Sequence, residues 1–213
     1  MNLSRYRYIV VEGPIGVGKT SLVKRLADHL GAATLLENAT DNPFLPRFYQ
    51  DPRRHALPTQ LHFLFDRSRQ LRDIAQADLF SAGTVADFLL DKDMLFARLN
   101  LDDDEFALYQ KVYADLAPRA PTPDLVIYLQ APVEVLQERV RRRGVEFERG
   151  MAADYLRRLA QSYSDFFHRY DAAPVLMVNS ENLDFTRADT DFELLLERMA
   201  KMRGQREFFS RAA

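Results

Sequence analysis

The stretch VEGPIGVGKTS, from Val11 to Ser21, lies near the start of the chain and decides how the rest is interpreted. Gly13, Gly18, Lys19 and Thr20 complete the pattern G-x-x-x-x-G-K-[ST]. In this pattern the backbone N–H groups of a glycine-rich turn surround phosphate oxygens, the lysine reaches the outer phosphates, and the hydroxyl can bind Mg²⁺. The stretch therefore predicts a P-loop for a nucleoside triphosphate, with an ordinary glycine turn as the alternative. The expected nucleotide-binding residues are Gly13, Pro14, Ile15, Gly16, Val17, Gly18, Lys19, Thr20 and Ser21.

The segments around the loop have the pattern of strands that alternate with helices. YIVVEG, from Tyr8, is typical of a buried strand, and apolar residues recur at helical spacing from Leu22 to Leu30. Four later apolar runs, ATLLE, GTVADF, DLVIYLQ and PVLMVN, are also typical of strands. This alternation predicts an α/β fold of the P-loop NTPase type, in three layers: a parallel five-stranded sheet with helices on both faces and ligands at the carboxyl ends of the strands. The C-terminal REFFSRAA either frays or packs on the body.

Length, composition and charge narrow the classes of partner. The chain has 213 residues, which we expect to form a single domain, and its net charge of −2 offers no basic field for nucleic acid or an anionic membrane. There is no cysteine for a disulfide or a thiolate metal site. No apolar run approaches the roughly 18 to 20 residues that span a bilayer, and the N-terminus has no signal-peptide pattern. We therefore expect a cytoplasmic protein that binds small molecules, without nucleic-acid or membrane partners.

The loop alone does not say whether the γ-phosphate goes to water or to an acceptor. Glu37, at the end of the second expected strand, would share the sheet edge with the P-loop. A carboxylate there can accept a proton from an attacking hydroxyl. The alternative for Glu37 is a surface acid at a strand end.

Five segments carry a more specific resemblance. EGPIGVGKTS, LLENATDNPFLPRFYQDP, TQLHFLFDRSRQL, TVADFLLDKDMLFA and RRRGVEFERGM, in this order and spacing, resemble the deoxyribonucleoside kinase family, and its bacterial deoxyguanosine and deoxyadenosine kinases in particular. The resemblance runs from Tyr8 to about Phe192. It implies ATP-dependent phosphorylation of the 5′-hydroxyl of a deoxyribonucleoside, expected to be a purine one, in nucleotide salvage. It also implies Mg²⁺ and a homodimer.

The same resemblance implies roles for individual acceptor-side residues. Glu37 matches the general base for the 5′-hydroxyl, and Gln60 matches the glutamine that binds the base edge. Tyr49 and Glu148 match the pair that holds the sugar 3′-hydroxyl, and Arg67 resembles the arginine that faces the acceptor. As alternatives, Gln60 and Arg67 are exposed helix polars, Tyr49 is a half-buried core aromatic, and Glu148 is a solvated loop acid.

A basic helix after the fourth expected strand supplies candidate cations. Arg139 and Arg143 are four residues apart and match the family arginines that clamp the transferring phosphate, within a lid around residues 139–150. Together with Lys19 and Glu37 they form the predicted catalytic set. Many relatives have a further arginine where this chain has Val145, so that Arg142 or Arg149 would have to supply that charge.

The end of the third expected strand departs from the family pattern. Most members have an acid, then an arginine, where this chain has Ala86, Asp87 and Phe88. We expect Asp87 to contribute to the acceptor site and to bind Mg²⁺ together with the P-loop threonine, with a helix cap as the alternative role. The missing cation would come from Lys92 or Arg67. Two rival functions stay open: a nucleoside monophosphate kinase, and a regulatory nucleotide-binding NTPase without a small-molecule acceptor.

Overall fold

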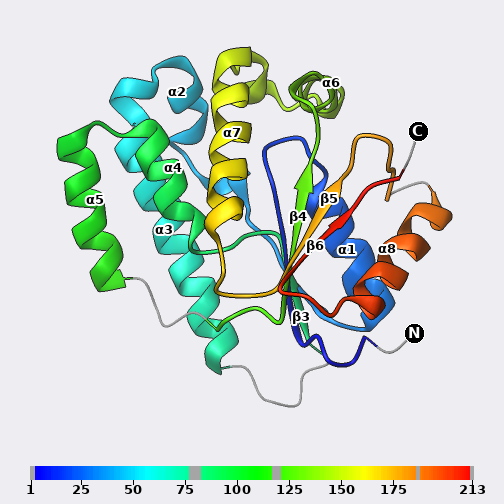
Figure 1. Cartoon of the computed structure of the whole chain (residues 1–213). Helices are drawn as coiled ribbons and strands as arrows, with labels where there is room; N and C mark the ends of the chain where they lie inside the picture. Colours follow the sequence, from blue (N-terminus) through cyan, green and yellow to red (C-terminus); the bar gives the residue numbers. More distant parts are fainter. Residues whose placement is uncertain (1–2, 77–82, 117–120, 186–187, 212–213) are drawn as a thin grey trace.

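The computed structural model describes residues 3–76, 83–116, 121–185 and 188–211. Its centre is a parallel sheet with the strand order β2-β3-β1-β4-β5-β6 (Figure 1). The strands are β1 (Tyr8–Glu12), β2 (Ala33–Leu35), β3 (Thr84–Ala86), β4 (Leu125–Gln130), β5 (Val175–Asn179) and β6 (Arg206–Phe209). The strand that leads into the P-loop is therefore central, between β3 and β4.

Within the described residues the sheet has six strands, so the prediction of five was wrong in this detail. The additional strand, β6, lies at the sheet edge and pairs in parallel with β5, with Val175 opposite Arg206. Edge strands keep one side in solvent, and Phe208 is 67% exposed. This short segment therefore lacks the continuous apolar run that marked the buried strands.

Helices cover both faces of the sheet, which confirms the three-layer prediction. In Figure 1, α1 and α8 lie on one face, while α3, α4 and α7 lie on the other, with α5 outside them. The helices are α1 (Lys19–Leu30), α2 (Leu45–Gln50), α3 (Pro52–Gln76), α4 (Lys92–Asn100), α5 (Asp103–Leu116), α6 (Val133–Arg143), α7 (Ala153–Arg169) and α8 (Asp189–Lys201), with short 3₁₀ helices η1 (Ala39–Asp41) and η2 (Glu146–Gly150). Among the described residues, no helix is long and apolar enough to cross a membrane.

Helix α3 begins earlier than its apolar stripe indicated. Leu61, Leu64 and Leu71 belong to an apolar stripe between residues 57 and 76, which by itself indicates a helix that starts near Leu57, behind Pro58. The helix instead starts at Pro52 and contains Pro58. The Asp51 carboxylate accepts a hydrogen bond from the Arg54 N–H at 3.3 Å. An Asp cap followed by Pro at the first helical position is a recognised start signal, and it outweighs the second proline in placing the boundary.

Two groups of buried apolar side chains fix the place of the site. One contains the strand residues and covers both faces of the sheet, with Val10 and Val126 fully buried. The other joins α2, α3, α4 and α5 around Phe88 and Tyr109, beside the sheet. Because the strands are parallel, their carboxyl ends open at one edge between these two groups.

Candidate functional site

The loop after β1 requires glycine at the positions that approach neighbouring backbone. Gly13 has φ +148° and Gly16 has φ +84°. A Cβ atom on Gly13 would lie 2.4 Å from the Leu129 carbonyl oxygen, and one on Gly16 would lie 2.8 Å from the Leu136 carbonyl oxygen. The loop is thus packed tightly against β4 and α6 and leads directly into the N-terminus of α1, where backbone N–H groups favour an anion.

Lys19, the first residue of α1, reaches back over the loop. Its Nζ donates hydrogen bonds to the carbonyl oxygens of Gly13 (2.7 Å) and Pro14 (3.2 Å). Burial and the positive charge of Lys92 lower the pKa of Lys19 to about 8, although neighbouring carboxylates oppose this. A bound phosphate would offer this ammonium group a charged acceptor and would raise its pKa.

Thr20 and Asp87 form an oxygen-rich corner beside Lys19. The Thr20 hydroxyl donates to Asp87 Oδ2 at 2.7 Å, and the backbone N–H of Glu37 donates to Asp87 Oδ1 at 2.7 Å. Asp87 does not cap α4, because its oxygens accept these two bonds instead. Mg²⁺ binds through one or two protein oxygens plus phosphates and water, and this pair fits such an ion. Within the described parts of the chain, no group of three or more His, Cys, Asp or Glu side chains could hold a metal.

The carboxylate of Glu37 lies between two cations. Arg67 donates to Glu37 Oε1 through Nε (2.6 Å) and through Nη2, and Lys92 Nζ lies 3.6 Å from Glu37 Oε2. Burial raises the pKa of Glu37, but the charges of Arg67 and Lys92 and the hydrogen bond from Arg67 outweigh it, so that the pKa falls to about 2. Glu37 is therefore ionised at neutral pH.

Four of the predicted acceptor residues line one cavity beside Glu37, whereas the fifth, Asp87, is not among the residues that line it. Tyr49, Gln60, Arg67 and Glu148 meet there, with apolar walls from Leu45, Phe48, Phe63, Phe96 and Tyr155. Gln60 is 3% exposed, Arg67 4% and Glu148 9%, so none of the three is an exposed surface residue. The Tyr49 ring stacks on a lid aromatic, Phe147, with centroids 6.1 Å apart. A polar group at one end and flat apolar walls suit a nucleoside.

The lid arginines face the P-loop. Arg139 donates to the carbonyl oxygens of Val17 (3.3 Å) and Ser180 (2.7 Å), and Arg143 Nε donates to Glu148 Oε2 at 3.2 Å. Both arginines line a cavity above the P-loop that also contains Lys19, Thr20, Glu37, Asp87 and Glu148. Lys19, Glu37 and Glu148 line this phosphate cavity and the acceptor cavity alike. The two cavities are therefore neighbours.

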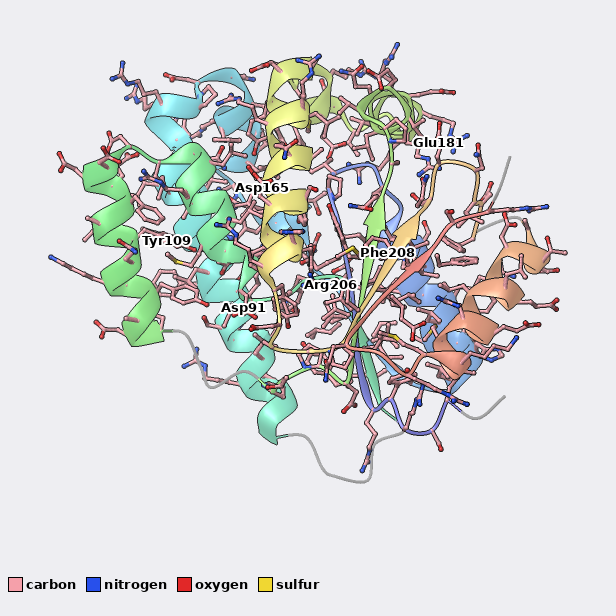
Figure 2. All side chains as sticks on the ribbon, in the orientation of Figure 1. Asp91, Tyr109, Asp165, Glu181, Arg206 and Phe208 are labelled. Atoms are coloured by element: carbon pink, nitrogen blue, oxygen red, sulfur yellow. The ribbon has the colours of Figure 1, made fainter. Side chains whose placement is uncertain are left out.

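A third groove was missed by the sequence reading. It runs from Gly16 and Ser21 past Arg139 and Arg142 to the loop of residues 181–185 after β5, where Figure 2 shows Glu181 beside α6. It shares no lining residue with the acceptor cavity. Its position suits the remainder of a nucleotide donor. Arg149 lines a different cavity, between α6 and α7.

Two buried carboxylates next to the acceptor cavity were also missed. Glu12 ends β1 and lies 3.1 Å from Lys92 Nζ through Oε1, and Asp93 pairs with Arg67 Nη1. Both carboxylates are fully buried. The signal for Glu12 was present, since an acidic residue closes an otherwise apolar buried strand and must find partners there.

A P-loop at the centre of a parallel sheet, with an anchored carboxylate at the same edge and lid arginines above, defines a P-loop kinase. Residues 9–202 match the family model described as deoxynucleoside kinase, and the chain belongs to this family. The family resemblance, the fold class and the assignment as a kinase are thereby confirmed.

Individual relatives cover most of the chain. It is 32% identical to a deoxyadenosine kinase of Lactobacillus acidophilus, over 92% of this chain and 96% of that one. It is also 32% identical to a deoxyguanosine kinase of Bacillus subtilis, over 87% and 92% of the two chains. A solved structure of the M. mycoides deoxyadenosine kinase, with the products dCMP and a flexible dCDP bound, has a TM-score of 0.80 at 24% identity and covers 92% of this chain and 100% of its own.

Proposed function

We propose that this deoxynucleoside kinase transfers the γ-phosphate of ATP to the 5′-hydroxyl of a purine deoxyribonucleoside, giving the 5′-monophosphate for nucleotide salvage. The observation that carries the proposal is the position of Glu37, whose carboxylate lines both the phosphate cavity and the acceptor cavity. A hydroxyl bound at that carboxylate would face the phosphate held by the loop. The purine preference is supported by relatives named for deoxyadenosine and deoxyguanosine.

On the donor side, positive charges would bind the phosphates of ATP. Lys19 and the N-terminus of α1 would hold the outer phosphates, and Arg139 and Arg143 would stabilise the negative charge of the group in transfer. Thr20 and Asp87 would hold Mg²⁺, which when bound neutralises phosphate charge and orients the oxygens. Each arginine would exchange a present partner, Ser180 or Glu148, for a phosphate oxygen.

On the acceptor side, Glu37 would act first by orientation. A carboxylate with a pKa of about 2 is a weak base, and phosphoryl transfer through a loose transition state needs little early proton removal. The hydroxyl becomes acidic as its bond to phosphorus forms, and the proton then passes to Glu37. Gln60 would pair with the base edge through its amide, and Tyr49 and Glu148 would hold the 3′-hydroxyl.

The cations of the acceptor cavity argue against a nucleoside monophosphate as acceptor. Such a substrate brings its own phosphate and needs free positive charge. Arg67 is engaged by Glu37 and Asp93, and Lys92 by Glu12 and Glu37. The cavity therefore suits an uncharged nucleoside better.

We also propose that residues 1–213 form one kinase domain whose lid, around residues 139–150, closes over the phosphates, and that two copies form a cytoplasmic dimer. The dimer rests on family resemblance and on exposed apolar side chains of neighbouring helices, Phe65 on α3 (52% exposed) and Leu108 on α5 (50%). Light scattering coupled to size exclusion would test it: a mass of one chain at micromolar concentration contradicts the dimer.

The test of the function is a transfer assay. ATP labelled at the γ-phosphate is incubated with Mg²⁺ and, in parallel, deoxyguanosine, deoxyadenosine, deoxycytidine or thymidine, with no-acceptor and nucleoside-monophosphate controls. We expect labelled 5′-monophosphate from one or both purine nucleosides. Label transfer to monophosphates alone would support the monophosphate kinase. Phosphate release that no nucleoside stimulates would support a regulatory NTPase.

A further inference from the structure

Glu12 is a buried carboxylate with a complete set of partners. Its Oε1 accepts the Leu89 N–H at 2.8 Å, and its Oε2 accepts the Gly13 N–H at 3.0 Å and the Tyr163 hydroxyl at 3.1 Å. Lys92 Nζ lies 3.1 Å from Oε1. Burial of a charge is unfavourable unless the charge is paired and hydrogen-bonded. The partners of Glu12 come from four segments of the chain: the P-loop, the connection after β3, α4 and α7.

Lys92 joins Glu12 to the acceptor cavity. This lysine is 2% exposed, and its Nζ lies 3.1 Å from Glu12 Oε1 and 3.6 Å from Glu37 Oε2. Lys92 itself lines the acceptor cavity. It is therefore closer to the carboxylate behind it than to the one that faces substrate.

The two carboxylate oxygens of Glu37 have different neighbours. Arg67 hydrogen-bonds Oε1 and is held from behind by Asp93. Lys92 Nζ lies 3.6 Å from Oε2 and forms a closer ion pair, at 3.1 Å, with Oε1 of Glu12. No described residue donates a hydrogen bond to Oε2, which is the oxygen left for an acceptor hydroxyl.

We propose that Glu12 is a positioning residue for phosphoryl transfer: it holds Lys92 back from Oε2 of Glu37 and ties this cation to the P-loop backbone through Gly13. The proposal rests on the role given to Glu37 under the proposed function. Without the charge of Glu12, Glu37 is the remaining carboxylate that pairs with Lys92 among the described residues. The ammonium group then closes on Oε2 and competes with the acceptor hydroxyl, while the donor side is unchanged.

The experiment compares Glu12→Gln, Lys92→Met and the double variant. Glu12→Gln should lower kcat by about 10- to 100-fold, since small misplacement of reacting groups has effects of this order, with the KM for ATP within about 2-fold of wild type. The double variant should be more active than Glu12→Gln, because no ammonium group is left to occupy Oε2. A merely structural Glu12 predicts the opposite order, with the double variant the least active.

The matched control is Asp124→Ala. Asp124 Oδ2 accepts the N–H groups of Arg7 (2.7 Å) and Tyr8 (2.8 Å), at the end of β1 opposite to Glu12. This variant should lower the melting temperature and leave kcat unchanged below that temperature. A Glu12→Gln enzyme with the kcat of this control, or a double variant no better than Glu12→Gln, would overturn the proposal.

Two further measurements cover the case in which Glu12→Gln does not fold and the case in which the proposed function itself is wrong. If Glu12→Gln does not fold, Lys92→Arg and Lys92→Met are compared instead: the longer arginine side chain can reach Oε2 of Glu37 past Glu12 and should give the lower kcat, and an arginine variant as active as the methionine variant or more active contradicts the proposal. Wild-type enzyme that transfers phosphate to no deoxynucleoside would refute the proposed function itself, which is a separate result.

Discussion

The donor and acceptor sides of this kinase are built in different ways. The donor loop is one run of residues, 13–21, whose shape comes from its backbone: Gly13 and Gly16, which leave no room for a Cβ, and the N–H groups at the start of α1. The acceptor cavity takes side chains from α2, α3, α4, α7 and the lid, and its charges are fixed by pairing. A backbone site tolerates few substitutions, whereas a site of paired side chains can change its substrate one residue at a time. Four predictions test this contrast.

The largest effect is expected at the point where the two sides meet. Glu37→Gln should lower kcat by about 10²- to 10⁴-fold, the usual contribution of a positioned acid or base, while ATP affinity changes little. Single-turnover transfer and a nucleotide-binding titration measure the two quantities. Glu134→Gln, on the exposed first turn of α6, is the control. Turnover close to wild type in the Glu37 variant would remove this carboxylate from the mechanism.

Nucleotide binding by the donor loop should be sensitive to substitutions that strain its backbone. Gly13→Ala places a methyl group against the Leu129 carbonyl oxygen at a positive φ, and strain of about 1–3 kcal/mol should raise the KM for ATP by roughly 10- to 100-fold. Gly31→Ala is the matched control, because that glycine also has a positive φ (+62°) but no atom within 4 Å of the added Cβ. It should lower stability only. Equal effects on the KM for ATP would mean that the contact with β4 is unimportant.

A change of one acceptor side chain should be milder. Gln60→Ala removes the expected partner of the base edge, and loss of hydrogen bonds worth about 1 kcal/mol or more should raise the deoxynucleoside KM about 10-fold with little change in the KM for ATP. Gln161→Ala, on the exposed side of α7, serves as control. If both KM values of the Gln60 variant stay at the wild-type level, the base binds elsewhere.

The smallest effect concerns stability and pH. Glu37 has a folded-state pKa of about 2, below its usual 4.5, so its ionised form stabilises the fold above pH 4.5 and this contribution is lost as pH falls through about 2. Wild type should exceed Glu37→Gln in unfolding free energy by on the order of 3 kcal/mol at pH 7. Urea unfolding at pH 7 and pH 3 measures it, and the difference should shrink at the lower pH. A constant difference would show that the two cations do not stabilise the carboxylate.

Prediction from sequence succeeded where the signal is local. Five strands, the P-loop and the placement of Glu37 and Asp87 after β2 and β3 followed from apolar runs and from the parallel order of strands. The edge strand β6 and the early start of α3 did not, because an edge strand needs no buried run and because the Asp51–Pro52 start signal lay outside the apolar stripe. The roles of the site residues stay predictions until the variants are measured.

The class of protein could be predicted from the amino-acid sequence alone. The glycines and Lys19 of the loop specify phosphate binding through local backbone geometry, which needs no distant contact. The pairing of the acceptor charges could be seen only in the folded chain: Glu12 and Asp93 are far from Glu37 in sequence, yet through Lys92 and Arg67 they set the surroundings of its carboxylate. Electrostatic pairing depends on distance and burial, and both come into being when the chain folds.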